Sequence, residues 1–121
     1  MKINVVKNNN VEVAIVESRD ILIKDVQSAI DLFATVEYET GVSRIVIEKE
    51  AICEEFFDLK TKIAGDILQK FINYKKKIAI VGDFSRYDSK SLKDFIYECN
   101  NGRDIFFLTS REEAIKKLSQ N

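Results

Sequence analysis

Residues 62–85 read KIAGDILQKFINYKKKIAIVGDFS, and this stretch decides the fold. Its first half carries apolar residues at helical spacing, from Ile63 through Ile67 to Phe71, which predicts an amphipathic helix. Its second half holds the unbroken apolar run 78–81, which is typical of a strand covered on both faces. A helix leading into a buried strand is the repeating unit of a parallel α/β sheet, so the sequence predicts that architecture.

The same alternation of strand and helix extends to both sides of this stretch. Two strands with alternating apolar residues flank Asn8-Asn9-Asn10 and predict an N-terminal β-hairpin. Buried strands are also predicted at 45–47 and 105–108. Helices are predicted from Asp25 to Gly41, from about Ser89 to Gly102, and from Ser110, in a capping box with Glu113, to Leu118. We therefore predict one α/β domain over residues 1–121, a small layered β-β-α-β-α-β-α-β-α fold with a mostly parallel sheet and the hairpin at its edge.

Composition excludes several kinds of chemistry. The 121 residues include no histidine, which rules out His-containing catalytic triads and His-ligated zinc within the chain. No GxGxxG or phosphate-loop motif is present, so we predict no cofactor, no metal and no catalytic residue. Cys53 and Cys99 lie far apart among apolar neighbours, which favours buried free thiols.

Charge and hydropathy also limit the partners. Nineteen basic and 20 acidic side chains give a net charge of −1, so we expect no nucleic-acid partner, and the run 75–77 of lysines is interpreted as a solvated turn. The N-terminal segment MKINVVKNNN has no apolar stretch of signal-peptide length. We also find no apolar stretch of the ~20 residues that a membrane span needs. A cytoplasmic protein without membrane contact is the expectation.

Polar side chains follow three buried strands, at the edge where open α/β sheets bind ligands. Gly82 is expected to make a sharp turn after its strand, and Arg86 with Tyr87 to form a small anion-binding lip. Thr109 and Ser110 follow the last strand. The candidate ligand-binding residues at this rim are Glu48, Lys49, Asp83, Ser85 and Arg86.

A second candidate site surrounds the start of the second helix. Asp58 is well placed to cap that helix. Gly65 lies inside it, where glycine costs about 1 kcal/mol relative to alanine, so we expect a close approach there by another helix or by a partner subunit. Packing of Ala64 and Gly65 would also fit a plain homodimer.

Three stretches carry a resemblance to a known family. They are FFDLKTKIAGDILQKFINYKKKIAIVGDFS, YDSKSLKDFIYECNNG and REEAIKKL. Over most of residues 20–118 the chain resembles a bacterial family known as domain of unknown function 4180, which implies no activity.

More loosely, the chain is similar to the STAS domains of anti-sigma-factor antagonists and to SpoIIAA-like proteins. That similarity implies a protein-binding switch in which a Ser or Thr is phosphorylated. The nearest counterpart is Thr61, although the family's Asp-Ser-Ser-Gly signature is absent here.

Two functions are left open. The first is a non-enzymatic regulatory or protein-interaction module that uses the surface around Asp58, Thr61 and Asp83 or the Gly65 helix face. The second is a small-ligand or anion-binding protein, with an enzyme included, that uses the polar rim. The first needs an exposed partner surface and the second a hollow with converging polar groups.

Overall fold

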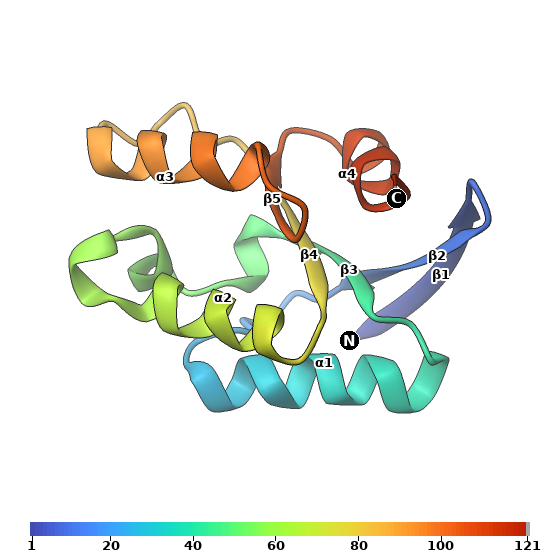
Figure 1. Ribbon diagram of the computed structural model, residues 1–121. Helices are drawn as coiled ribbons and strands as arrows, with labels where there is room; N and C mark the ends of the chain where they lie inside the picture. Colours follow the sequence, from blue (N-terminus) through green and yellow to red (C-terminus); the bar gives the residue numbers. More distant parts are fainter. Residues whose placement is uncertain (121) are drawn as a thin grey trace.

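The computed structural model describes residues 1–120 and contains a five-stranded sheet with four α-helices (Figure 1). Three short 3-10 turns follow the third strand. In chain order the elements are β1 (Lys2–Asn8), β2 (Val11–Glu17), α1 (Val26–Thr40), β3 (Arg44–Glu48), η1 (Lys49–Ala51), η2 (Glu54–Phe57), η3 (Leu59–Thr61), α2 (Ile63–Asn73), β4 (Lys77–Val81), α3 (Lys90–Asn100), β5 (Ile105–Leu108) and α4 (Arg111–Leu118).

The sheet has the order β1-β2-β3-β4-β5. β1 pairs antiparallel with β2, and every later pair is parallel. Each crossover therefore advances the chain by one strand in the same direction. The crossover helices α1, α2 and α3 consequently lie on one face of the sheet. The predicted small layered α/β fold, with the hairpin at the sheet edge, is confirmed.

Local sequence explains how the first elements begin and end. Asn9 and Asn10 have φ of 54° and 63°, the left-handed conformation that a tight hairpin turn requires. Asp25 caps α1 by accepting a hydrogen bond from the Ser28 amide at 2.8 Å. Gly41 ends α1 with φ of 74°. The predicted hairpin and the predicted limits of the first helix are confirmed.

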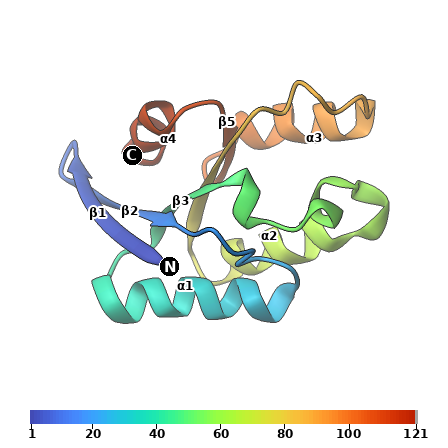
Figure 2. The same cartoon turned by 180° about the vertical axis from the view of Figure 1, so that it is seen from behind.

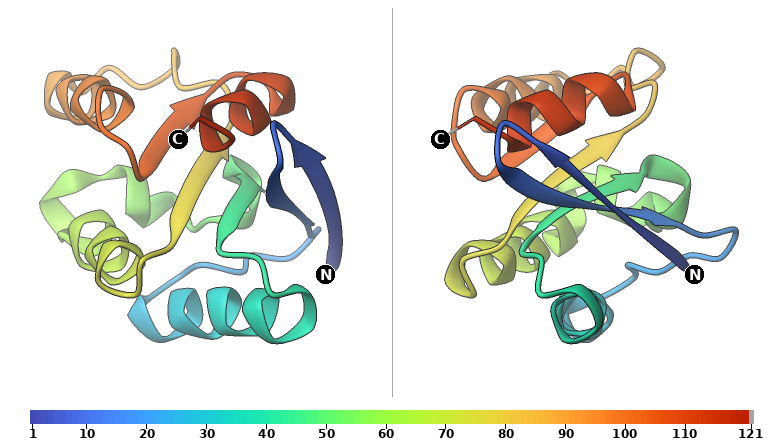
Figure 3. Two further views of the ribbon diagram at one scale, coloured as in Figure 1. Left: turned by 45° about the vertical axis from the view of Figure 1, so that its right-hand side comes forward. Right: turned by 90° about the vertical axis from the view of Figure 1, so that its right-hand side faces the viewer.

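Alternate residues of the strands enter two separate cores. One core lies beneath α1, α2 and α3, and the other beneath α4 alone (Figure 3). In β4, Ile78 and Ile80 join the first core, whereas Ala79 and Val81 join the second. Both faces of the strand are covered, as its unbroken apolar run predicts.

The last helix runs antiparallel to the strand that it covers. Arg111, at the start of α4, pairs with Glu48 at the end of β3. The carbonyl of Leu118, at the end of α4, accepts a hydrogen bond from Arg44 at the start of β3. α4 thus spans the sheet from its carboxyl edge to its amino edge. The predicted capping box is only half formed, because Ser110 accepts from the Glu113 amide but the Glu113 carboxylate accepts from side-chain hydroxyls.

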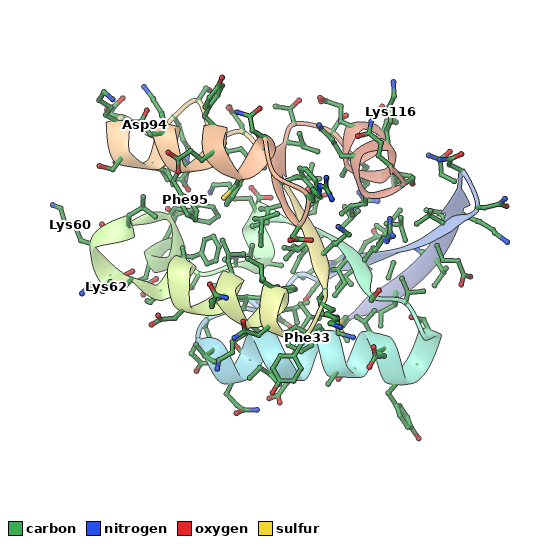
Figure 4. The ribbon with its side chains drawn as sticks, in the orientation of Figure 1. Phe33, Lys60, Lys62, Asp94, Phe95 and Lys116 are labelled. Carbon is green, nitrogen blue, oxygen red and sulfur yellow. The ribbon has the colours of Figure 1, made fainter. Side chains whose placement is uncertain are left out.

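The lysine run 75–77 is not a solvated turn throughout, so that prediction is wrong. Lys76 is buried and pairs with Glu37, and its Nζ lies 5.9 Å from the ring centroid of Phe33, which is labelled in Figure 4. The Nζ of Lys77 lies 3.0 Å from Asp104. Long lysine stems can cover apolar surface while their charged ends find partners, and a single sequence does not show this.

Both cysteines are free thiols. Cys53 is buried, as predicted, whereas Cys99 is only half-buried. None of the helices described over residues 1–120 has both the length and the apolar composition that crossing a membrane requires.

Candidate functional site

The carboxyl edge of the sheet brings together the segments that follow β3 and β4, as the sequence predicts. Figure 2 shows the starts of α1, α2 and α3 on the same side of the molecule, where these segments lie. The predicted rim does not form one site, however. Its side chains divide into three groups, centred on Glu54, Arg111 and Asp83, and each group is held by its own contacts.

Three donors converge on the Glu54 carboxylate. Its Oε1 atom lies 2.9 Å from the Lys49 Nζ, 2.8 Å from an Arg86 guanidinium nitrogen and 3.0 Å from the Tyr87 hydroxyl. The Lys49 side chain is 6% exposed, whereas that of Glu54 is 58% exposed. With Phe57, which lies beneath them, these four residues form what we call the Glu54 cluster.

Aromatic rings support the buried cation of this cluster. The Lys49 Nζ lies 5.0 Å from the ring centroid of Phe57 and 5.1 Å from that of Tyr87, which is within cation–π range. The two rings stack with centroids 5.5 Å apart. Burial alone would lower the pKa of Lys49, but the neighbouring Tyr87 and Glu54 raise it above its ordinary value. Lys49 is therefore a structural cation and stays protonated at neutral pH.

The pKa of Glu54 is shifted in the opposite direction. The hydrogen bond from Lys49 lowers the pKa of this carboxyl below its ordinary value of 4.5, with smaller help from Tyr87 and Arg86. Glu54 is thus ionised at neutral pH and balances the charge of Lys49. Glu54 is not among the residues predicted from the sequence, because its position depends on two consecutive 3-10 turns that no strand or helix period predicts.

The other rim residues lie outside this cluster. Glu48 accepts a hydrogen bond from the Arg111 Nε at 2.9 Å, and Arg111 also lies 3.5 Å from Glu17. Asp83 accepts from the Ser85 amide at 3.0 Å and from the Ser85 hydroxyl at 2.6 Å, which lowers the pKa of Asp83. Of the five predicted rim residues, only Lys49 and Arg86 belong to the Glu54 cluster.

A hollow of about 410 Å³ adjoins the Glu54 cluster. Ile21, which is 52% exposed, and the carboxylates of Glu50 and Glu55 line it, and Lys49, Ile52, Cys53, Glu54 and Arg86 complete the lining. Sequence reasoning missed Ile21, Glu50 and Glu55. The segment before α1 and the turns after β3 meet through the backbone, where the Leu22 amide donates to the Ala51 carbonyl at 2.7 Å.

Asp58 does not cap α2, so that prediction is wrong. Its carboxylate accepts from the Lys60 amide at 3.2 Å and caps the turn η3 instead. α2 begins at Ile63, after Lys62 with φ of 65° and no side-chain cap. Figure 4 shows Lys60 and Lys62 pointing outward at this corner. The inserted 3-10 turn separates Asp58 from the helix, and this separation accounts for the error.

Thr61 and Gly65 lie on the exposed surface near the start of α2. The Thr61 hydroxyl lies 2.8 Å from the Asp58 carbonyl and 3.0 Å from the Glu55 carbonyl, so its proton is already engaged. A Cβ atom built on Gly65 would meet no atom within 4 Å. The predicted close approach by another helix of the same chain is therefore wrong.

Within residues 1–120, no three or more carboxylate or thiol side chains gather as metal ligands would. The serine and threonine hydroxyls at the carboxyl edge donate to neighbouring carboxylates or carbonyls, as Ser85 does to Asp83 and Thr61 to Asp58. A nucleophile needs a base that accepts its proton and room for a substrate. Charged side chains at the carboxyl edge pair with one another, as Lys49 and Arg86 do with Glu54 and Arg111 does with Glu48.

A family model described as Domain of unknown function (DUF4180) matches residues 8–118. The chain therefore belongs to that family, and the resemblance stated from the sequence is confirmed. No curated protein and no solved structure matches the chain. The similarity to STAS domains stays a prediction.

Proposed function

We propose that this member of the DUF4180 family is a non-enzymatic, regulatory protein-interaction module. Its partner contacts the hollow beside the Glu54 cluster with a basic side chain and an apolar side chain. The observation that carries this proposal is the combination of exposed Ile21 with Glu50 and Glu55 in one hollow of about 410 Å³.

The charges of the hollow favour a basic partner. Its lining holds three glutamates and two cations, and both cations contact Glu54. Among residues 1–120, neither Glu50 nor Glu55 lies within 4.0 Å of a basic side-chain nitrogen. A lysine or arginine of the partner would meet these two carboxylates, and such complementarity mainly improves specificity and association rate.

Ile21 supplies the apolar part of the proposed contact. Ile21 is a large aliphatic side chain that is half exposed at the edge of a hollow. A partner that covers it stabilises the complex by about 25 cal/mol per Å² of apolar surface buried. Interfaces commonly place such an anchor among charged residues at their rim. The carboxyl edge therefore offers an anchor and a charged rim in one place.

Affinity capture from lysate tests this proposal with two charge-reversal variants. The wild type is compared with Glu50→Lys/Glu55→Lys and with a matched control, Glu12→Lys/Glu39→Lys, whose exposed glutamates lie on β2 and α1. We expect a protein that is retained by the wild type and by the control to be lost from the hollow variant. A partner retained equally by all three proteins would contradict the proposed surface.

Regulation by phosphorylation of Thr61 forms part of this proposal. A phosphate there would break the hydroxyl contacts to Glu55 and Asp58 and would be repelled by the Asp58 carboxylate, so the corner between η2 and α2 would rearrange. Intact mass of the protein from its own cells should show the mass of one phosphate, and Thr61→Val should abolish that addition. A cytoplasmic setting fits the two free thiols.

A second candidate function is binding of a small anion at the Glu54 cluster. It is favoured by the convergence of Lys49, Arg86 and Tyr87 on one carboxylate, because a ligand carboxylate could take the place of Glu54. In a metabolite thermal-shift panel, Glu54→Gln should then strengthen the response and Arg86→Gln should remove it. A panel without any response would exclude this function.

A further inference from the structure

The amino edge of the sheet, opposite the Glu54 cluster, carries a hollow of about 450 Å³. Arg44 and Lys77 are the first residues of β3 and β4 and are register partners. They share a face with Val46 and Ala79, because side chains alternate along a strand, and α4 covers that face. Arg103 before β5 and Lys117 of α4 add two more basic side chains. The remaining lining residues are Gly102, Phe106 and Gln120.

Four cations therefore surround one hollow in a chain whose net charge is −1. Lys77 is the one member of the four with an ion pair among residues 1–120, to Asp104 at 3.0 Å. Its Nζ also donates to the Arg103 carbonyl at 2.7 Å. Among residues 1–120, no carboxylate oxygen lies within 4.0 Å of a side-chain nitrogen of the other three, so three of the four cations have no ion-pair partner there.

Two of the four cations also have structural roles. Arg44 donates to the Leu118 carbonyl, which stabilises the end of α4. The Lys117 Nζ lies 5.6 Å from the ring centroid of Phe106, within cation–π range. Arg103 has no such role, because it is exposed, follows the end of α3 and contacts Lys77 only through its backbone carbonyl. The Arg103 guanidinium therefore makes no structural contact that would offset its repulsion by the other three cations.

We propose that this hollow is a binding site for a small molecule that carries a phosphate group. A phosphate monoester bears nearly two negative charges at neutral pH, which matches the local excess. The guanidinium groups of Arg44 and Arg103 can each bind phosphate oxygens through two parallel hydrogen bonds. The volume lies in the range of small-molecule sites.

A nucleic-acid backbone fits the same residues less well. Binding a phosphate chain needs a stripe of cations along an exposed face, whereas these four surround a single hollow. The proposed site is also independent of the protein-interaction surface, since the two lie at opposite edges of the sheet. Failure of one proposal would leave the other standing.

Titration by calorimetry and by amide NMR tests the site with the intact chain. The phosphate probes are inorganic phosphate, pyrophosphate and glucose 6-phosphate, and the comparison ligands are citrate and a single-stranded oligonucleotide. We expect at least one phosphate-bearing probe to bind with a Kd below about 1 mM and to shift the amide signals of Gly102 and Phe106. Tighter binding of the sugar phosphate would indicate an organic phosphate, and equal or tighter binding of the inorganic probes would indicate free phosphate.

The variant Arg103→Gln/Lys117→Gln should weaken this binding by at least about tenfold, because it removes two charged hydrogen-bond donors from the hollow. The matched control Lys24→Gln/Lys93→Gln also loses two charges at exposed positions and should bind as the wild type does. The proposal is overturned if no phosphate probe binds, or if citrate or a single-stranded oligonucleotide binds more tightly than every phosphate probe. It is also overturned if the control variant loses as much affinity as the hollow variant, or if the shifted amides lie elsewhere.

Discussion

Gly82 lies directly against Lys49, and the Cβ atom that Gly82 lacks would stand 2.7 Å from the Lys49 Cβ and 3.0 Å from its Cδ. The chain bends at Gly82, as the sequence predicts, but the φ there lies outside the left-handed region, so the bend itself does not require glycine. Its role is to leave room for the buried lysine stem. The Glu54 cluster therefore depends on a glycine in the neighbouring strand's loop.

Gly82→Ala should lower the free energy of unfolding by about 1–3 kcal/mol, because the added methyl group displaces Lys49 from a packed position. Urea unfolding followed by circular dichroism measures this change. Lys49→Ala/Gly82→Ala provides the control, since it removes part of the stem that the methyl group meets. If the added cost of Gly82→Ala is the same in both backgrounds, the Cγ and Cδ atoms of Lys49 are not its cause, and only the Cβ contact remains.

Gly65→Ala should have the opposite effect and raise the free energy of unfolding by about 0.5–1 kcal/mol. The position is helical and exposed, and nothing lies within 4 Å of the added Cβ. Thermal unfolding of the isolated protein shows whether this gain occurs. If Gly65→Ala is destabilised only where the protein self-associates, a second copy packs against this glycine.

The ion pair of Glu54 should make stability depend on pH in the acid range. The folded-state pKa of Glu54 is lowered, so its contribution is present above the ordinary carboxyl value of 4.5 and is lost as the pH falls through the folded-state pKa. Unfolding free energies of wild type and Glu54→Gln should therefore differ at pH 7 and converge in acid. Glu55→Gln is the matched control, and a difference that persists below the folded-state pKa would contradict this account.

Neither thiol should react quickly in the folded protein. Burial, with a smaller contribution from Glu98, raises the pKa of Cys99 to about 11, so almost no thiolate is present at pH 8. Cys53 is 8% exposed and is shielded by packing. Reaction with a thiol reagent at pH 8 should be slow and should accelerate greatly in denaturant. Fast labelling of native Cys99→Ala protein would show that Cys53 is accessible.

The sequence predicted which segments would meet at the carboxyl edge, but it did not predict how their charges would pair. Lys49 and Arg86 follow adjacent parallel strands, so their proximity follows from topology. Glu48 is the last residue of β3, yet it pairs with Arg111 of α4, because α4 crosses the opposite face of the sheet. Strand order does not fix which helix a terminal side chain will reach.

The period of apolar residues by itself determined the element order, the parallel sheet and the limits of α1, because these follow from local backbone preference and from which faces must be buried. The tertiary structure alone decided two things. It placed Glu54 over Lys49 through consecutive 3-10 turns, and it gathered Arg44, Lys77, Arg103 and Lys117 around one hollow. Both arise from contacts between residues distant in sequence, whose charges carry no periodic signal and are positioned only when the packed elements fix their distances.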